Sequence, residues 1–129
     1  MGIAPPGGPQ GLGNKAARFR EVYANSDCLV QMTFLNSSGV ATEPTSIQYR
    51  LDSLTRPQNI IAWTSVTPTG SAQILQIPGS LMVPTAPWLG RENWQLWIQA
   101  VISDTNATSG SITVNKLQFL QLIAECVPY

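Results

Sequence analysis

The stretch ENWQLWIQAVISD, residues 92–104, alternates between two kinds of side chain along its whole length. One face carries apolar side chains, namely Trp94, Leu96, Ile98, Ala100 and Ile102. The opposite face is mixed, with Gln95, Trp97, Gln99 and Val101. A period of two is typical of a β-strand that packs one face into a core. We therefore predict that this stretch forms the longest strand of a β-sheet domain.

Segments on both sides of this stretch show the same alternation. Residues 27–36 (DCLVQMTFLN) place one apolar set on a single face: Cys28, Val30, Met32 and Phe34. Residues 46–53 (SIQYRLDS) do the same with Ile47, Tyr49 and Leu51. Further strand-like runs occupy residues 60–68, 72–79 and 112–129, with turn sequences such as NSSG (36–39) between runs. About six or seven short strands predict an antiparallel β-sandwich, with Trp63 and Tyr49 as large core residues.

Two segments do not fit a central strand. Residues 80–90 (SLMVPTAPWLG) contain two prolines, and each proline removes a ladder donor. This segment is predicted to be an edge segment or a long loop that exposes Met82 and Trp88. Residues 1–20 (MGIAPPGGPQGLGNKAARFR) are rich in glycine and proline and offer little to bury. We predict an extended N-terminal arm over residues 1–26, with a short helical turn or extended chain near its end, and a sandwich over residues 27–129.

The amino-acid composition of the chain limits the classes of function that we expect. The chain has 129 residues and a formal net charge of +0, and 11% of its residues are charged. No basic stripe is present, so nucleic-acid binding is not expected. No apolar run reaches the roughly 20 residues of a membrane span, so no membrane interaction is expected. The low charge fits a surface covered by partners or a polar, uncharged β-protein surface, and both interpretations stay open.

The residues needed for catalysis are sparse. The sequence has no histidine, and its two cysteines, Cys28 and Cys126, lack metal or redox spacing. We expect buried thiols rather than a disulfide, and whether the two cysteines pair stays open. No phosphate-binding glycine loop is present. The acidic residues leave a facing carboxylate pair open, but no pattern points to one. We therefore expect no enzyme, with no catalytic, cofactor-binding or metal-binding residues.

One part of the chain resembles a known family. Residues 47–79 carry a Tyr-Arg-Leu-Asp strand, a polar turn, a Trp-Thr-x-Val-x-Pro strand and an Ile-Pro ending. This order is similar to small tailed-bacteriophage virion proteins, which are immunoglobulin- or fibronectin-like sandwiches. Residues 115–129 are longer and more apolar than a simple fibronectin-like module, so a jelly-roll variant stays open. The positions that carry the resemblance are Tyr49, Arg50, Leu51, Asp52, Trp63, Thr64, Val66, Pro68, Ile77 and Pro78.

The resemblance implies a structural role in a virion. The expected protein is a capsid cement or decoration protein, made in the host cytoplasm and located on the capsid surface. It would bind the major capsid protein, as a homo-oligomer on the particle, and stabilise the phage head across capsomer seams. The alternative is a tail, neck or baseplate module that binds host-surface glycans.

Two groups of residues are candidates for partner binding. The first is the arm, which would lie across a neighbour or, alternatively, fold back over its own sandwich. Ile3 and Leu12 are its apolar anchors, and the remaining arm candidates are Lys15, Arg18, Phe19 and Arg20. The second group is a pair of exposed aromatic side chains, Trp88 and Trp97, because tryptophan is enriched at binding hot spots.

Overall fold

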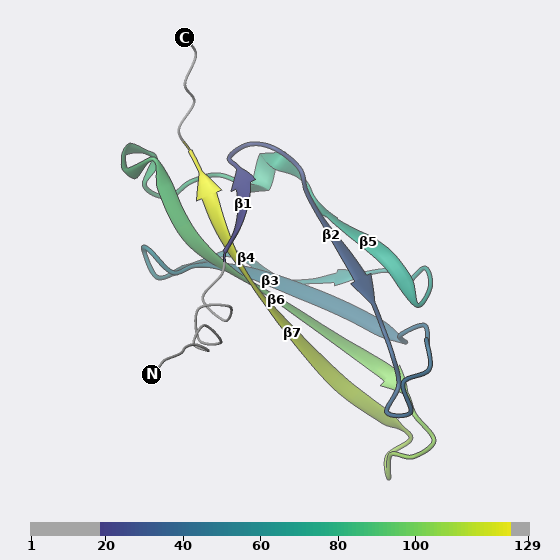
Figure 1. Cartoon of the computed structure of the whole chain (residues 1–129). Coiled ribbons are helices and arrows are strands. Elements are labelled where there is room, and N and C mark those ends of the chain that lie inside the picture. Colours follow the sequence, from purple (N-terminus) through teal and green to yellow (C-terminus); the bar gives the residue numbers. More distant parts are fainter. Residues whose placement is uncertain (1–18, 125–129) are drawn as a thin grey trace, which may run out of the picture.

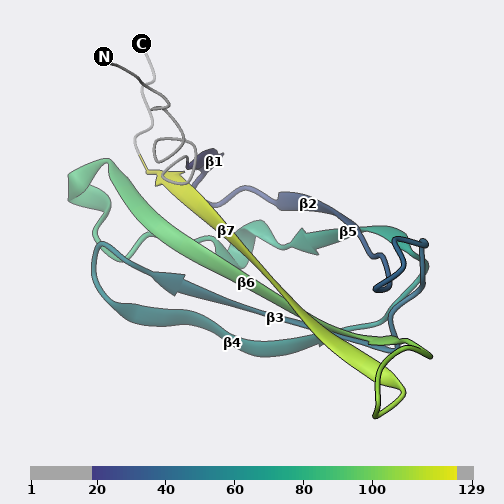
Figure 2. The same cartoon turned by 60° about the horizontal axis from the view of Figure 1, so that its bottom comes forward.

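The computed structural model describes residues 19–124, which form two packed β-sheets (Figures 1 and 2). The larger sheet has the strand order β1-β7-β6-β3-β4, and the smaller sheet pairs β2 with β5. The strands are β1 (Arg20–Tyr23), β2 (Cys28–Thr33), β3 (Ser46–Ser53), β4 (Gln58–Val66), β5 (Ala72–Ile77), β6 (Arg91–Ser103) and β7 (Ser111–Ile123). Two 3-10 turns, η1 (Gly79–Leu81) and η2 (Pro87–Leu89), lie between β5 and β6.

The strand order is that of an immunoglobulin-type sandwich. The second and fifth strands form one sheet, whereas the third, sixth and seventh belong to the other, with β4 added beside β3. The chain therefore passes between the layers in the connections β1–β2, β2–β3, β4–β5 and β5–β6. This arrangement confirms the predicted all-β sandwich. It also corresponds to the immunoglobulin-like alternative rather than the eight-stranded jelly roll.

The predicted boundary between arm and sandwich at residue 26 is too late. Residues Arg20–Tyr23 form β1, which pairs in parallel with Leu120–Ile123 at the edge of β7. Val22 is buried in the shared core. This segment is therefore extended, and it belongs to the sandwich because the edge of β7 supplies its backbone partners.

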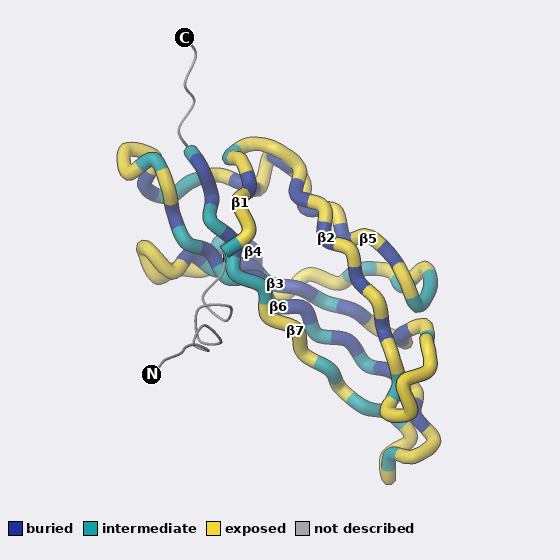
Figure 3. The backbone as a smooth tube through the Cα atoms, in the orientation of Figure 1, coloured by how far each residue is buried: buried dark blue, intermediate teal, exposed yellow. Residues whose placement is uncertain are grey.

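The core follows the predicted alternation closely. Each of the five apolar residues predicted for one face of β6 is at most 4% exposed. The predicted inward sets of β2 and β3 are also buried, Tyr49 included. Along β6 the tube in Figure 3 alternates between buried and intermediate residues. β6 and β7 pair over their full length, from Arg91 with Ile123 to Ser103 with Ser111.

Two core predictions are wrong. Trp63 is 41% exposed, because the register between β3 and β4 shifts between Tyr49 and Leu51. Such a bulge places one extra residue on β4 and turns the side chains that follow to the other face. Met82 is fully buried, since its backbone ties the segment to Asn25, whose N–H donates to the Met82 carbonyl at 2.8 Å.

Candidate binding face

Within residues 19–124, no group of three or more acidic or cysteine side chains is arranged to hold a metal ion. In the same range, no helix is long and apolar enough to cross a membrane. Two carboxylates in the described part of the chain are nevertheless buried, Glu92 and Asp104. Both are surrounded by donors of the protein itself, and each therefore stabilises loops.

Glu92 lies at the start of β6 and is 1% exposed. It accepts hydrogen bonds from the Thr85 hydroxyl at 2.7 Å, the Ala86 N–H at 2.7 Å and the Trp94 indole at 3.1 Å. Burial acts to raise the pKa of this carboxyl, but the hydrogen bonds from Ala86, Thr85 and Trp94 outweigh it, and the pKa is lowered. Glu92 thus anchors the η1–η2 segment as an ionised acceptor.

The outer face of the larger sheet carries a row of aromatic and apolar side chains around one arginine. The register places Arg50 of β3 beside Trp97 of β6, and Trp97 beside Leu117 of β7. The bulge in β4 brings Trp63 to the other side of Arg50, and the Arg50 guanidinium carbon lies 5.8 Å from the centre of the Trp63 ring. Trp63 and Leu117 are exposed, and Trp97 is half-buried.

Polar rows flank this aromatic row on both sides. On one side Gln48, Gln99 and Asn115 lie across three adjacent strands. The Gln48 amide donates to Gln99, and the Gln99 amide donates to Asn115 at 3.1 Å. On the other side, Asp52 of β3 lies between Asn59 of β4 and Gln95 of β6. Aromatic surface bordered by amides and one ion pair is suited to binding through stacking and hydrogen bonds.

The ion pair on this face is held in place. The Arg50 Nε and Nη2 atoms donate to the two oxygens of Asp52 at 3.0 and 2.9 Å. The Asn59 amide donates to the same carboxylate at 2.9 Å. Partial burial raises the pKa of Asp52, but the hydrogen bonds from Arg50 and Asn59 lower it by more. The guanidinium is therefore fixed over the Trp63 ring before any partner binds.

The second predicted aromatic residue lies in a different setting. Trp88 stands on η2 and is 73% exposed. The Arg56 guanidinium carbon, from the turn between β3 and β4, lies 5.7 Å from the centre of its ring. The structure thus places Trp88 against Arg56, and Trp97 on the sheet face beside Arg50.

Only two of the six arm candidates, Phe19 and Arg20, lie within the described residues. Ile3, Leu12, Lys15 and Arg18 lie outside the described residues. Phe19 packs on Phe119 of β7 with ring centres 5.4 Å apart. Arg20 opens β1 and pairs with Leu120.

Sequence reasoning missed Trp63 as a surface residue and missed the polar rows. No local signal in the sequence predicts the outward turn of Trp63, because Ile61, Trp63 and Ser65 fit an unbroken alternation and the shift is visible only in the pairing of β4 with β3. The polar rows carried no local signal, because their members come from strands that are distant in sequence.

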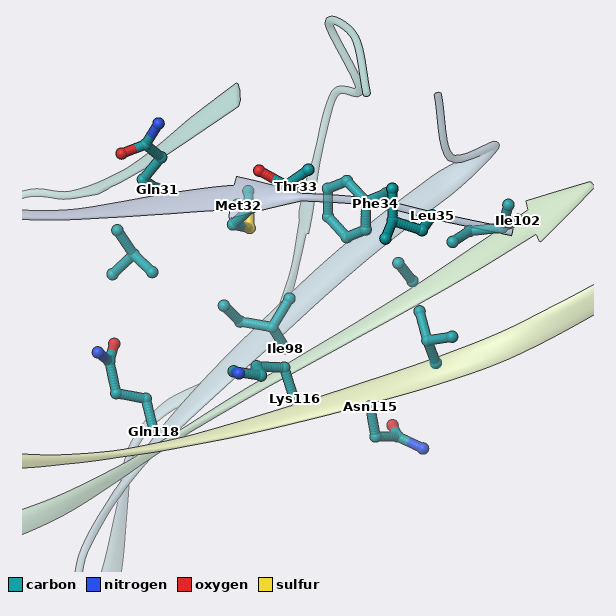
Figure 4. Close-up of a pocket in the computed structure, with 13 residues that line it drawn as sticks. Gln31, Met32, Thr33, Phe34, Leu35, Ile98, Ile102, Asn115, Lys116 and Gln118 are labelled. Atoms are coloured by element: carbon teal, nitrogen blue, oxygen red, sulfur yellow. The ribbon is translucent and has the colours of Figure 1, made fainter. Parts of the chain in front are cut away.

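A groove opens at the side of the sandwich, between β2 and β7 (Figure 4). Its volume is about 530 Å³. Met32 of β2 and Phe34, the residue after β2, line it on one side, and Ile98 lines it from β6. Gln118 of β7 points into it, whereas Asn115 points away toward the outer face.

Comparisons with known proteins identify no relative. No protein-family model, no curated protein and no solved structure matches the chain. Arguments about function therefore depend on the geometry described above.

Proposed function

We propose that this chain is a non-catalytic structural protein of a bacteriophage virion, a cement or decoration protein that docks on the major capsid protein. The observation that supports this proposal is the outer face of the larger sheet. Aromatic side chains and an oriented arginine lie there between two polar rows, which consist of amides and the carboxylate of Asp52, on a chain with few charges. Such a face binds by adding contact area, and Trp and Arg are the residue types that dominate interface energies.

The protein would stabilise the assembled shell because it binds the shell and buries contact area there. A protein that binds the assembled shell but not the separated subunits shifts the equilibrium toward the shell. Many copies seated at capsomer seams would each contribute an interface of roughly 1,200–2,000 Å² in total. A rigid sheet face suits this task because little conformational entropy is lost when it binds.

Occupancy on particles tests this proposal. Particles would be reconstituted with wild-type protein, Trp97→Ala or Ile74→Ala, and bound copies counted by quantitative mass spectrometry. Ile74 is the matched control, because it is an exposed apolar residue on the smaller sheet. We expect hundreds of bound copies for wild type and Ile74→Ala, and at least tenfold weaker binding for Trp97→Ala. A handful of copies per particle, or equal losses in both variants, would contradict a shell role on this face.

A second function is favoured by the same face: glycan binding by a tail, neck or baseplate module. The specific observation is that Arg50 lies over the Trp63 ring and pairs with Asp52, which also accepts a hydrogen bond from Asn59. Sugar hydroxyls bind amides and carboxylates, while sugar rings stack on tryptophan. A glycan array with the purified chain separates the two functions. Selective binding that is lost in Trp63→Ala and kept in Trp88→Ala would favour glycans. No selective binding would leave the capsid proposal as the better one.

A further inference from the structure

We propose that the groove between β2 and β7 binds an amphipathic carboxylate, that is, a ligand with an apolar chain whose head group carries a carboxylate and an adjacent hydrogen-bond donor. This inference does not depend on the proposed function. It rests on two polar side chains, Lys116 and Gln118, that the fold places among the apolar side chains of the core.

Lys116 and Gln118 both lie on the inner face of β7. The register pairs Lys116 with Ile98 and Gln118 with Leu96. Directly opposite residues of an antiparallel pair point to the same side of the sheet, and Ile98 and Leu96 are buried in the core. The two inner positions that follow along β7 are fully buried leucines. Polar residues therefore replace apolar ones on this face where the groove opens (Figure 4).

Apolar side chains line the groove from three strands. Val30 and Met32 come from β2, Ile98 and Ala100 from β6, and Val114 from β7. The groove volume of about 530 Å³ lies within the range of small-molecule sites, roughly 300–1,000 Å³. Such sites are mostly apolar and contain a small number of convergent polar groups. The apolar chain of a ligand would thus bury its surface against these five side chains.

The charge of Lys116 selects the sign of the head group. No aspartate or glutamate is among the described residues that line the groove. Within residues 19–124, the ion pairs join Arg50 with Asp52 and Arg91 with Glu21, and neither pair includes Lys116. A carboxylate complements this ammonium group, because a hydrogen bond between two charged groups is stronger than one between neutral groups.

The side-chain oxygen of Gln118 indicates that the head group also donates a hydrogen bond. This oxygen is buried and has no hydrogen-bond partner in the described part of the chain. Buried acceptors are normally paired, and one left without a donor is destabilising. A carboxylate offers acceptors only, whereas an N-acyl amino acid has an amide N–H next to its carboxylate. A ligand of this class would pair both polar side chains and place its acyl chain on the apolar ones.

A titration of the full chain with N-decanoylglycine tests the proposal. Methyl NMR spectra would be recorded at ligand concentrations below those at which micelles form. We expect a dissociation constant on the order of 0.1–1 mM, with shifts of the methyl signals of Met32 and Ile98. Leu29 and Ile74 are exposed on the smaller sheet and do not line the groove, so their signals should stay unchanged.

Two matched ligands separate the contributions of the head group. N-decanoylsarcosine carries a methyl group in place of the amide hydrogen, so it cannot donate to Gln118. We expect it to bind about fivefold more weakly than N-decanoylglycine. Decyltrimethylammonium keeps an apolar chain but reverses the charge, and we expect its binding to be weaker by about tenfold or more.

Three variants assign these contributions to side chains. Lys116→Met keeps an apolar stem without the charge, and it should weaken binding of N-decanoylglycine about tenfold. Gln118→Leu should bind both acyl amino acids with equal affinity, because the acceptor is gone. Gln95→Leu is the matched control, since Gln95 lies on the outer face of β6, and it should bind as wild type does. Urea unfolding of each variant would confirm that the protein is folded at the temperature of the titration.

Three results would overturn the proposal. Absence of binding to the wild-type chain would show that the groove is closed to this class of ligand. Equal affinity of the wild-type chain for N-decanoylglycine and N-decanoylsarcosine would show that Gln118 does not recognise the head group. Shifts at Leu29 and Ile74 without shifts at Met32 and Ile98 would place the ligand on another surface.

Discussion

The indole of Trp94 donates a hydrogen bond of 3.1 Å to the carboxylate of Glu92, and both side chains are at most 1% exposed. The two residues lie next to each other on the inner face of β6. This pair joins the largest fully buried side chain of the core to the segment that carries η1 and η2, because Glu92 also accepts hydrogen bonds from Thr85 and Ala86.

This relationship predicts a pH dependence of stability. The pKa of Glu92 is lowered in the folded protein, so its contribution is fully present above the unfolded-state pKa of about 4.3 and is lost as pH falls through the folded pKa. Glu92→Gln should lower the free energy of unfolding by about 1–3 kcal/mol at pH 7. The difference from wild type should shrink at pH 3. Urea unfolding at both pH values measures this, with Glu43→Gln as an exposed control. A difference that stays constant with pH would contradict the assignment.

A second buried carboxylate joins two loops at the opposite end of β6. Asp104 accepts hydrogen bonds from the Ser37 N–H at 2.8 Å and the Asn106 N–H at 2.9 Å. Hydrogen bonds from Ser37 and Asn106 lower the pKa of this carboxyl. Asp104→Ala should remove the acceptor of the Ser37 N–H and make exchange of the Ser37 amide several-fold faster. Amide exchange measured by NMR checks this, and an unchanged Ser37 rate would show that the loop is held by other contacts.

Local sequence patterns were sufficient to predict which faces of the main strands are buried. The alternation in β2, β3 and β6 identified their buried faces, because a strand with one face in the core must place every second side chain there. Tyr49 and the apolar face of β6 are buried as this rule requires. The rule works on these strands because their inner-face residues follow each other without interruption.

Structural features that depend on pairing between residues distant in sequence could not be predicted from local patterns. β1 exists because Arg20–Tyr23 pair with Leu120–Ile123 at the other end of the chain. The bulge in β4 turned Trp63 outward, and the polar row of Gln48, Gln99 and Asn115 forms only when β3, β6 and β7 align. Register between distant strands therefore decides the candidate binding face, whereas periodicity decides the core.

The thiol of Cys28 provides a test of packing at the start of β2. Cys28 is 2% exposed, and burial raises the pKa of its thiol, although the nearby Arg20 lowers it in part. Because the thiolate is the reactive form, labelling of native protein should be slow. In a Cys126→Ser protein, we expect a thiol reagent to label Cys28 at least tenfold more slowly than a cysteine introduced by Ser109→Cys in the exposed β6–β7 turn. Similar labelling rates would show that β2 opens readily.

Gly79 marks the closest backbone approach around η1, and it gives the sharpest stability prediction. A Cβ atom at this position would lie 2.7 Å from the carbonyl oxygen of Asn25, which is backbone and has little room to move. The Gly79 N–H also donates to Asp27 at 2.6 Å, so the residue is held from both sides. Gly79→Ala should therefore lower the free energy of unfolding by about 1–3 kcal/mol, the usual cost of overpacking. Ser80→Ala is the matched control, since the neighbouring Ser80 is exposed and should tolerate the change. Equal unfolding midpoints in urea for the two variants would show that the chain at Asn25 moves aside without cost.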